Sequence, residues 1–205
     1  GSVLGFEAGV RENRGAEAAP AVATIVGRWQ AQFRDVLAEP IAWSTEEIDF
    51  RSENFRRAVV ESWLLSYPDA DVAVTNAGGL REPLPAGEIT FNDLVNTMPV
   101  ENTLVVANLP GSVLLRILEE GGRPIVGGLV RRGESWVETR TGEPVADERI
   151  YQVLINSFMY DGGDNFHAIA EADPDGLDTG VNYRQPFVDW LRSRQTSPDN
   201  PLVLD

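Results

Sequence analysis

The sequence of 205 residues contains no cysteine, no lysine and a single histidine, His167. Without cysteine the chain forms no disulfide and offers no thiolate to a metal or a substrate. Without lysine it has neither a Schiff-base nucleophile nor the lysine of a P-loop. One histidine excludes a metal site with two histidine ligands, and we expect His167 to have a structural or helix-capping role. The chain is therefore poorly equipped for hydrolysis by itself.

Positive charge is also scarce. All 17 basic residues are arginines, and they face 32 acidic residues, for a net charge of −15. Such a chain is repelled by nucleic-acid polymers and anionic membranes, although a few neighbouring arginines still suit a small anionic ligand. No apolar run approaches the roughly 18 residues of a membrane span. The first residues lack the basic start and apolar core of a secretion leader. We expect neither a nucleic-acid partner nor a membrane-spanning segment.

Hydrophobic periodicity indicates an α+β fold with mixed α/β layers. Apolar residues from Val22 to Leu37 recur at helical spacing, and a second helix is expected from Asn54, as N-cap, to Tyr67. Further helices are expected at 90–95, 113–118 and 187–191, strands at 71–75, 103–107, 136–140 and 150–155, and a loop at 171–182. We predict one domain over residues 1–205, with residues 1–19 as a lead-in and residues 196–205 as a loose tail.

Two loops with paired glycines stand out, each directly after a predicted strand. They read TNAGGLR at 75–81 and FMYDGGDNF at 158–166. Loops at strand ends commonly carry ligand contacts. A plain turn needs fewer special residues than two glycines beside two carboxylates and two aromatic rings. The pattern therefore raises the possibility of a binding site built from both loops.

The residue types in the first loop suit an anionic or sugar ligand. Gly78 and Gly79 would let backbone N–H groups approach it, while Asn76 and Arg81 bring donors. The alternative interpretation is an ordinary tight turn, with Arg81 paired to a surface acid.

The second loop suits a nucleoside. Asp164 would accept hydrogen bonds from the paired hydroxyls of a ribose, and Phe158 or Tyr160 would stack on a flat base. Together, the two loops indicate a nucleoside or nucleotide pocket, with tight turns again as the alternative.

Several longer stretches carry a family resemblance. DVAVTNAGGLREPLPAGEITFNDLVNTMPVENTLVVANLPGSVLLRILEEG and VETRTGEPVADERIYQVLINSFMYDGGDNFHAI resemble the C-terminal domain of the 5′-nucleotidases, in motif order and spacing. That family includes UDP-sugar hydrolases and cyclic-nucleotide phosphodiesterases. The resemblance implies a domain that binds base and ribose. It also implies a separate N-terminal metallophosphatase domain, absent from this chain, that holds two divalent metals and cleaves the phosphate ester.

The resemblance also assigns roles by position. It implies that Asn76 and Arg81 contact ribose or phosphate, that Asp164 binds the ribose hydroxyls and that Phe158 stacks on the base. It further matches three residues to the substrate site: Asn102 to a base-edge contact, Gly128 to a base-contacting glycine and Arg51 to the family arginine. No residue of this chain is expected to be catalytic or to bind a metal. The resemblance also implies a periplasmic or extracellular protein.

Departures from the family pattern keep alternatives open. Val100 stands where the family has a second stacking phenylalanine, and Arg56 and Arg57 replace a Gly-Asn pair. The chain is thus expected to be the nucleotide-recognition domain of a 5′-nucleotidase. The alternatives are the same domain in a cyclic-nucleotide phosphodiesterase or UDP-sugar hydrolase, and a non-enzymatic binding or adhesion domain whose pocket has decayed.

Overall fold

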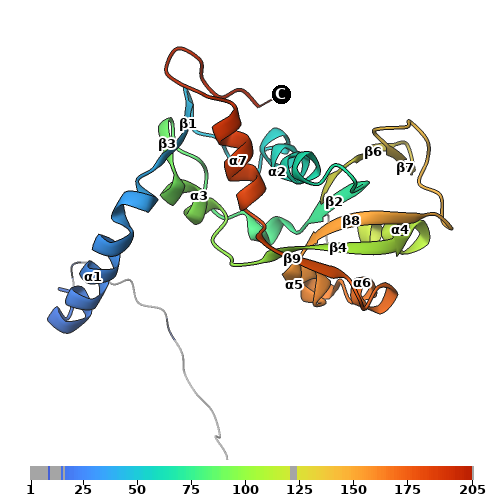
Figure 1. The fold of residues 1–205 in the computed structure, drawn as a ribbon, viewed down its shortest axis with the longest axis horizontal. Helices are drawn as coiled ribbons and strands as arrows, with labels where there is room; N and C mark the ends of the chain where they lie inside the picture. The colour runs from blue at the N-terminus through green and yellow to red at the C-terminus, as the bar shows by residue number, and fades with distance from the viewer. Residues whose placement is uncertain (1–8, 10–14, 16, 121–123, 205) are drawn as a thin grey trace, which may run out of the picture. The chain divides into compact units, whose positions relative to one another are not determined.

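The computed structural model describes residues 9, 15, 17–120 and 124–204, and the chain divides into two compact units, residues 1–37 and 38–205 (Figure 1). The described part of the first unit contains helix α1 (Pro20–Leu37). Pro20 begins it, as predicted, and Thr24 Oγ1 donates to the Pro20 carbonyl at 2.9 Å. Trp29 and Phe33 stack along its side with ring centroids 6.0 Å apart. Every residue of α1 is at least partly exposed.

The second unit is built around a five-stranded sheet. Its strand order is β5 (Ile125–Gly127), β2 (Val72–Thr75), β8 (Ile150–Asn156), β4 (Thr103–Pro110) and β9 (Leu177–Asn182). β2 and β8 are parallel, while the β5–β2, β8–β4 and β4–β9 pairs are antiparallel. The β-branched runs predicted as strands form the buried centre of this sheet, where backbone groups are satisfied by neighbours on both sides.

Helices cover both faces of the sheet, which gives three layers (Figure 1). One apolar cluster unites α2 (Glu53–Ser66) and α7 (Gln185–Ser193) with Ala73, Leu104 and Leu154 of the sheet. The opposite cluster unites α4 (Gly111–Glu120), α5 (Ser157–Tyr160) and α6 (Ala168–Ala172) with Val74, Val153 and Ile155. Side chains alternate between the two clusters because successive residues of a strand point to opposite faces.

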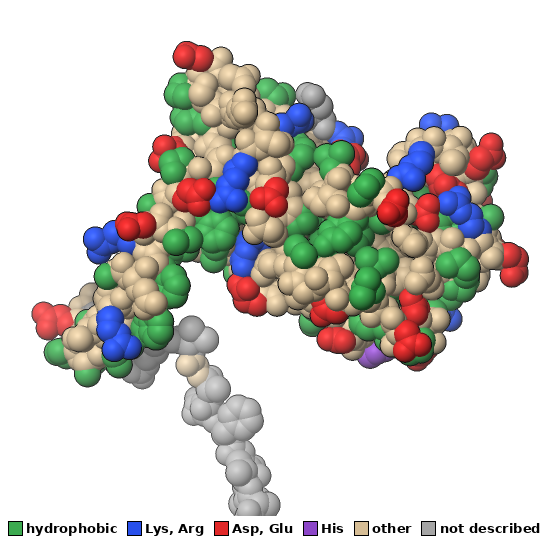
Figure 2. Space-filling model, in the orientation of Figure 1, with side chains coloured by type: hydrophobic (Ala, Val, Ile, Leu, Met, Phe, Trp, Pro, Cys, Tyr) green, Lys and Arg blue, Asp and Glu red, His purple; other side chains and the backbone are tan. Residues whose placement is uncertain are grey.

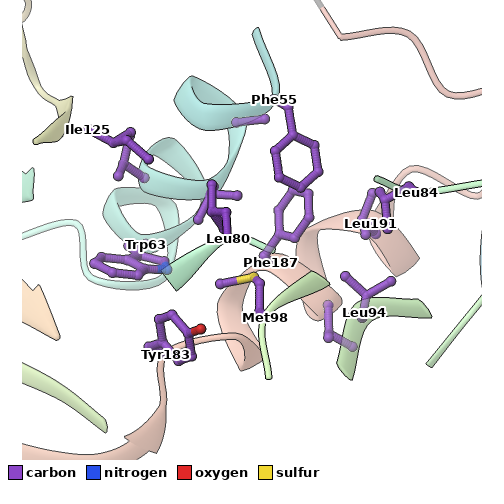
Figure 3. Packing of buried hydrophobic residues seen from close by; sticks show 14 of the residues in the cluster. Phe55, Trp63, Leu80, Leu84, Leu94, Met98, Ile125, Tyr183, Phe187 and Leu191 are labelled. Atoms are coloured by element: carbon purple, nitrogen blue, oxygen red, sulfur yellow. The ribbon is translucent and has the colours of Figure 1, made fainter. Parts of the chain in front are cut away.

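Aromatic residues form the centre of the α2–α7 cluster (Figure 3). Phe55 meets Phe187 edge to face at 5.4 Å, and Trp63 meets Tyr183 in the same way at 6.2 Å. All four are at most 1% exposed. Such pairs add to the stabilisation from burial alone.

Smaller elements complete the unit. β1 (Pro40–Ser44) pairs with β3 (Gly87–Thr90), and β6 (Leu129–Arg132) pairs with β7 (Ser135–Glu138). Helix α3 (Phe91–Thr97) begins with the predicted cap, in which Thr90 and Asp93 exchange side-chain-to-backbone hydrogen bonds. Two short 3₁₀ turns, η1 (Ala77–Gly79) and η2 (Gly163–Asn165), lie in the diglycine loops.

Three local predictions are corrected. The cap of α2 is Ser52, which accepts from the Phe55 N–H, and not Asn54, whose Nδ2 instead donates to the Leu204 carbonyl. The segment predicted as a loop at 171–182 contains strand β9. The C-terminal tail is anchored, since Leu202 is buried and its N–H donates to the Trp43 carbonyl at 2.8 Å.

Candidate functional site

The two diglycine loops meet because of the strand directions in the five-stranded sheet. The parallel strands β2 and β8 end at Thr75 and Asn156, beside one another. β4 is antiparallel to β8 and begins at this end, where Leu104 pairs with Asn156. β9 finishes there too, because Thr103 pairs with Asn182. We call this the Asn76 end of the sheet. The loops after β2 and β8 and the loop before β4 all lie at it.

Asn76 and Asp164 join the two loops directly. Asn76 Nδ2 donates to Asp164 Oδ2 at 2.8 Å, and Asn76 Oδ1 accepts from Asn156 Nδ2 at 3.0 Å. Asn156 also donates to Thr75 Oγ1 at 2.9 Å and caps α5 by accepting from the Met159 N–H. Because Asn156 is fully buried, these bonds replace all its contacts with water. A buried hydrogen-bonded chain therefore sets the position of the Asp164 carboxylate.

The second loop shows why two glycines follow Asp161. Gly162 has φ +90°, and a Cβ on it would lie 2.4 Å from the His167 ring. A Cβ on Gly163 would lie 2.4 Å from the Phe158 ring, so the Gly163 backbone packs against that ring. Only glycine permits both the left-handed backbone and these close approaches.

The two residues after the glycines are themselves in an uncommon conformation. Asp164 has φ 54° and Asn165 has φ 70°, the left-handed region that most L-residues avoid. Such backbone strain is concentrated at functional sites. Here it presents an exposed carboxylate whose Oδ1 accepts no hydrogen bond from the described residues. That oxygen is available to a ligand.

Tyr183 packs against the first loop and forms a hydrogen bond with it. The ring packs 3.4 Å from where a Gly79 Cβ would be, and its hydroxyl donates to the Gly79 carbonyl at 2.9 Å. The Tyr183 backbone N–H donates to the Asn102 carbonyl at 2.9 Å, so Tyr183 links the loop after β2 to the loop before β4. Burial raises the pKa of Tyr183 to about 12, with the nearby Arg184 charge opposing the shift.

Arg184 anchors the loop before β4. It is buried, donates to the Met98 carbonyl and pairs with Glu101. Asn102 lies in this loop, with its carbonyl accepting from the Tyr183 N–H at 2.9 Å.

The exposed fraction of Val100 is 37%, which is similar to the 42% of Phe158. Tyr160 is committed elsewhere, because its hydroxyl donates to the Asp173 carbonyl and accepts from the Gly176 N–H. Of the three rings in the second loop, Phe158 is the most exposed, since Tyr160 is partly buried and Phe166 is 2% exposed.

Not every predicted site residue lies with Asn76 and Asp164. Gly127 pairs with Ala73, so Gly128 lies beside Val72, at the opposite end of β2. A Cβ on Gly128 would lie 2.3 Å from the Asp71 carbonyl oxygen, which gives this glycine a packing role. Arg81 is exposed and lines a hollow with Glu47, Glu82 and Asp93. Arg51 precedes α2, with its guanidinium 4.5 Å above the Phe50 ring.

Sequence reasoning overlooked two residues that organise the site, Asn156 and Tyr183. Asn156 begins the motif NSFMYDGGDNF. The signal that could have identified it is a polar residue at the end of a buried strand. Tyr183 lies 19 residues beyond Asp164 in sequence, and only the β4–β9 pairing brings it beneath the first loop.

His167 is exposed and occupies the N-cap position of α6 without a side-chain cap bond. In the described part of the chain, no group of three or more His, Cys, Asp or Glu side chains is arranged to hold a metal ion. None of the described helices has the length and apolarity of a membrane-spanning segment.

Comparisons with known proteins match this architecture. Residues 40–171 match the family model described as 5′-nucleotidase, C-terminal domain. The chain is 26% identical to the trifunctional nucleotide phosphoesterase protein YfkN of Bacillus subtilis, covering 93% of this chain and 15% of that protein. It is 25% identical to the NAD 5′-nucleotidase of Haemophilus influenzae, covering 66% of this chain and 28% of that protein. The chain thus spans well under a third of either relative.

A solved structure shares the fold. The 5′-nucleotidase precursor from Thermus thermophilus superposes with a TM-score of 0.75 at 24% identity, covering 86% of this chain and 41% of that one. The family model matches more than half of the chain, across both diglycine loops and the strands that bring them together. This chain belongs to the family of 5′-nucleotidase C-terminal domains.

Proposed function

We propose that this domain recognises the base and ribose of a nucleotide for a phosphoester hydrolase whose catalytic residues lie elsewhere in the full-length protein. The observation that carries the proposal is the 2.8 Å hydrogen bond between Asn76 and Asp164, which joins the two diglycine loops. It fixes one carboxylate oxygen and leaves the other for a ligand. A carboxylate in this state suits the neighbouring 2′ and 3′ hydroxyls of a ribose.

Phe158 supplies the contact with the base. One side of its ring packs on the Gly163 backbone, while 42% of the side chain is exposed. An exposed aromatic face stacks on any nucleobase, at about 1–3 kcal/mol per base. Because Val100 replaces the second ring of the family pattern, the base is stacked on one side only. We expect correspondingly weaker affinity, by roughly tenfold.

The remaining predicted contacts divide into two groups. Asn102 lies at the Asn76 end of the sheet and remains a candidate for the base edge, while Gly78 and Gly79 remain candidates for backbone contacts. Arg81 and Arg51 are candidates for the phosphate, since neither has a carboxylate partner in the ion pairs of the described residues. Gly128 is not included, because it lies at the other end of β2.

The hydrolytic step requires groups that this chain lacks. With one histidine, no cysteine and no metal-binding group among its described residues, the domain does not fit the two divalent metals of the family. The metals and the attacking water would belong to an N-terminal metallophosphatase domain. Binding energy from the base and ribose would then orient the ester at that remote centre. By analogy with the family, we expect the full-length protein to act in the periplasm or outside the cell.

Isothermal titration of the chain with AMP and adenosine tests the proposal. We expect Asp164→Ala to weaken the binding of both ligands by about tenfold or more, because it removes a charged acceptor. Asp161→Ala is the matched control, since Asp161 is an exposed carboxylate of the same loop. The absence of heat at millimolar ligand, or identical behaviour of both variants, would indicate a decayed pocket. Assays of the full-length protein on AMP, 2′,3′-cyclic AMP and UDP-glucose would separate the enzyme classes.

A further inference from the structure

A second hollow lies away from Asn76 and Asp164, between α2 and the β6–β7 hairpin. It has a volume of about 1150 Å³, enough for a ligand of nucleotide size. Figure 2 shows the molecule indented between its main body and this hairpin, with basic side chains on both sides. We call this hollow the α2–β7 groove.

Arginines dominate the walls of the groove. The α2 side carries Arg51, Arg56 and Arg57, and the hairpin side carries Arg131 and Arg140. Only two acidic residues, Glu53 and Glu61, line the same space. Five of the 17 basic residues thus lie around one groove in a chain with a net charge of −15. This concentration creates a region of positive potential on a surface that is otherwise mainly negative.

Three of these guanidinium groups have no carboxylate partner in the ion pairs of the described residues: Arg51, Arg56 and Arg140. Arg140 donates to the Pro68 carbonyl at 3.2 Å. The Nε of Arg56 is buried without a hydrogen-bond partner among the described residues, which is a costly state for a charged group. An anion in the groove would reduce the repulsion between the arginines.

The floor of the groove is apolar and lies mainly toward the Gly128 end of β2. Leu64 of α2 packs beside Gly127, and Leu129 and Trp136 complete the lining on the hairpin side. Gly128 and the hairpin lie toward the end of β2 opposite Asn76, whereas Ile125 pairs with Thr75 and brings the other end of the groove close to the candidate nucleotide site.

We propose that the α2–β7 groove binds a small molecule that carries a diphosphate group. Arginines on the two walls engage an anion with two charged groups better than one with a single group. The planar guanidinium fork matches the geometry of phosphate oxygens. Arg56 and Arg140 are the residues that bind it, one from each wall. The apolar floor accepts an organic substituent of the diphosphate.

Isothermal titration with inorganic pyrophosphate at low ionic strength tests the proposal. The chain should bind pyrophosphate at one site, and Arg140→Ala and Arg56→Lys should each weaken that binding by about tenfold. Arg56→Lys keeps the positive charge but removes the planar guanidinium group. It therefore tests the geometry of the guanidinium separately from its charge. Arg132→Ala is the matched control, because Arg132 is an exposed arginine of the same hairpin that does not line the groove. It should change the affinity by less than about twofold.

Two further measurements make the result decisive. Far-UV circular dichroism confirms that each variant is folded, and Asp164→Ala should bind pyrophosphate as the unaltered chain does. Loss of binding in Asp164→Ala would overturn the separate site. Equal losses in Arg132→Ala and Arg140→Ala, no binding at millimolar pyrophosphate, or citrate binding as tightly as pyrophosphate would each overturn the proposal.

Discussion

Helices α1 and α2 carry apolar stripes of the same helical spacing, and only α2 buries its stripe. In α2, Phe55, Val59 and Trp63 are fully buried in the core of residues 38–205. In α1, Val22, Trp29 and Phe33 are 45–56% exposed, although their sequence pattern is equally regular. The difference teaches that periodicity identifies the apolar face of a helix, whereas the chain that surrounds it decides whether that face contributes to stability.

The largest expected contrast is between the two tryptophans. Trp63→Ala should lower the free energy of unfolding by about 3–5 kcal/mol, because it removes a fully buried aromatic side chain and leaves a cavity. Trp29→Ala should change it by less than about 0.5 kcal/mol, because Trp29 is 47% exposed. Urea denaturation followed by circular dichroism measures both. A loss of 2 kcal/mol or more (about the value for burying a large side chain) in Trp29→Ala would show that the α1 stripe is covered in solution.

Trp63→Phe refines the same comparison. The indole Nε1 of Trp63 is buried without a hydrogen-bond partner in the described part of the chain. Phenylalanine removes this unsatisfied donor while it keeps most of the apolar volume, so we expect a much smaller loss than with alanine. A loss equal to that of Trp63→Ala would mean that the indole shape, and not its burial, is what the core requires.

The next prediction concerns the pH dependence of folding stability, and it involves residues 38–205 alone. The pKa of Tyr183 is raised to about 12 by burial, above its ordinary value near 10. Above pH 10 the unfolded chain loses this proton before the folded chain does, so stability is full below pH 10 and declines as the pH rises toward 12. The decline amounts to about 2–3 kcal/mol.

Unfolding measurements across this pH range test the assignment. The chain contains no lysine, so tyrosines dominate titration between pH 10 and 12, and residues 1–37 contain no tyrosine. Tyr183→Phe should flatten the decline, at some cost in stability at neutral pH from the lost hydrogen bond to Gly79. An unchanged alkaline decline in this variant would contradict the role of Tyr183.

The smallest contrast is between two helical glycines. Gly27→Ala in α1 should stabilise the helix by about 1 kcal/mol, because nothing lies within 4 Å of the new Cβ and alanine has the higher helix propensity. Gly111→Ala, at the start of α4, should instead destabilise the domain by about 1–3 kcal/mol, because the Cβ would lie 2.1 Å from the Ala146 carbonyl oxygen. Helical ellipticity and urea midpoints measure the two effects. Equal changes in both variants would contradict the comparison.

Much of the fold was predictable because its central elements have strong local patterns. The buried runs 103–107 and 150–155 are strands, and Pro20, Thr90 and the apolar residues near Phe187 correctly indicated helices. The strands β1, β3, β5, β6 and β9 were not predicted. They are short or only partly buried, and their stability comes from pairing with distant segments, which local propensity does not report.

The candidate site shows the same division. The diglycine loops, Asp164 and Phe158 were visible in sequence because each loop directly follows a predicted strand, where ligand contacts are commonly found. The sequence did not show that Asn156 connects the two loops or that Tyr183 supports the first one. It also did not show that the Tyr160 hydroxyl forms hydrogen bonds with the turn at 173–176. Each depends on contacts between segments that the sheet topology brings together.

The sequence by itself determined that this chain has no cysteine, no lysine and a single histidine, that it forms alternating helices and strands, and that two glycine-rich loops follow buried strands. These properties depend on composition and on near neighbours in the chain. Only the tertiary structure decided that the Asn76 and Asp164 side chains share a hydrogen bond, that Gly128 lies at the other end of β2, and that arginines from two distant segments line one groove. Strand pairing and helix packing set these arrangements, because they act between residues far apart in sequence.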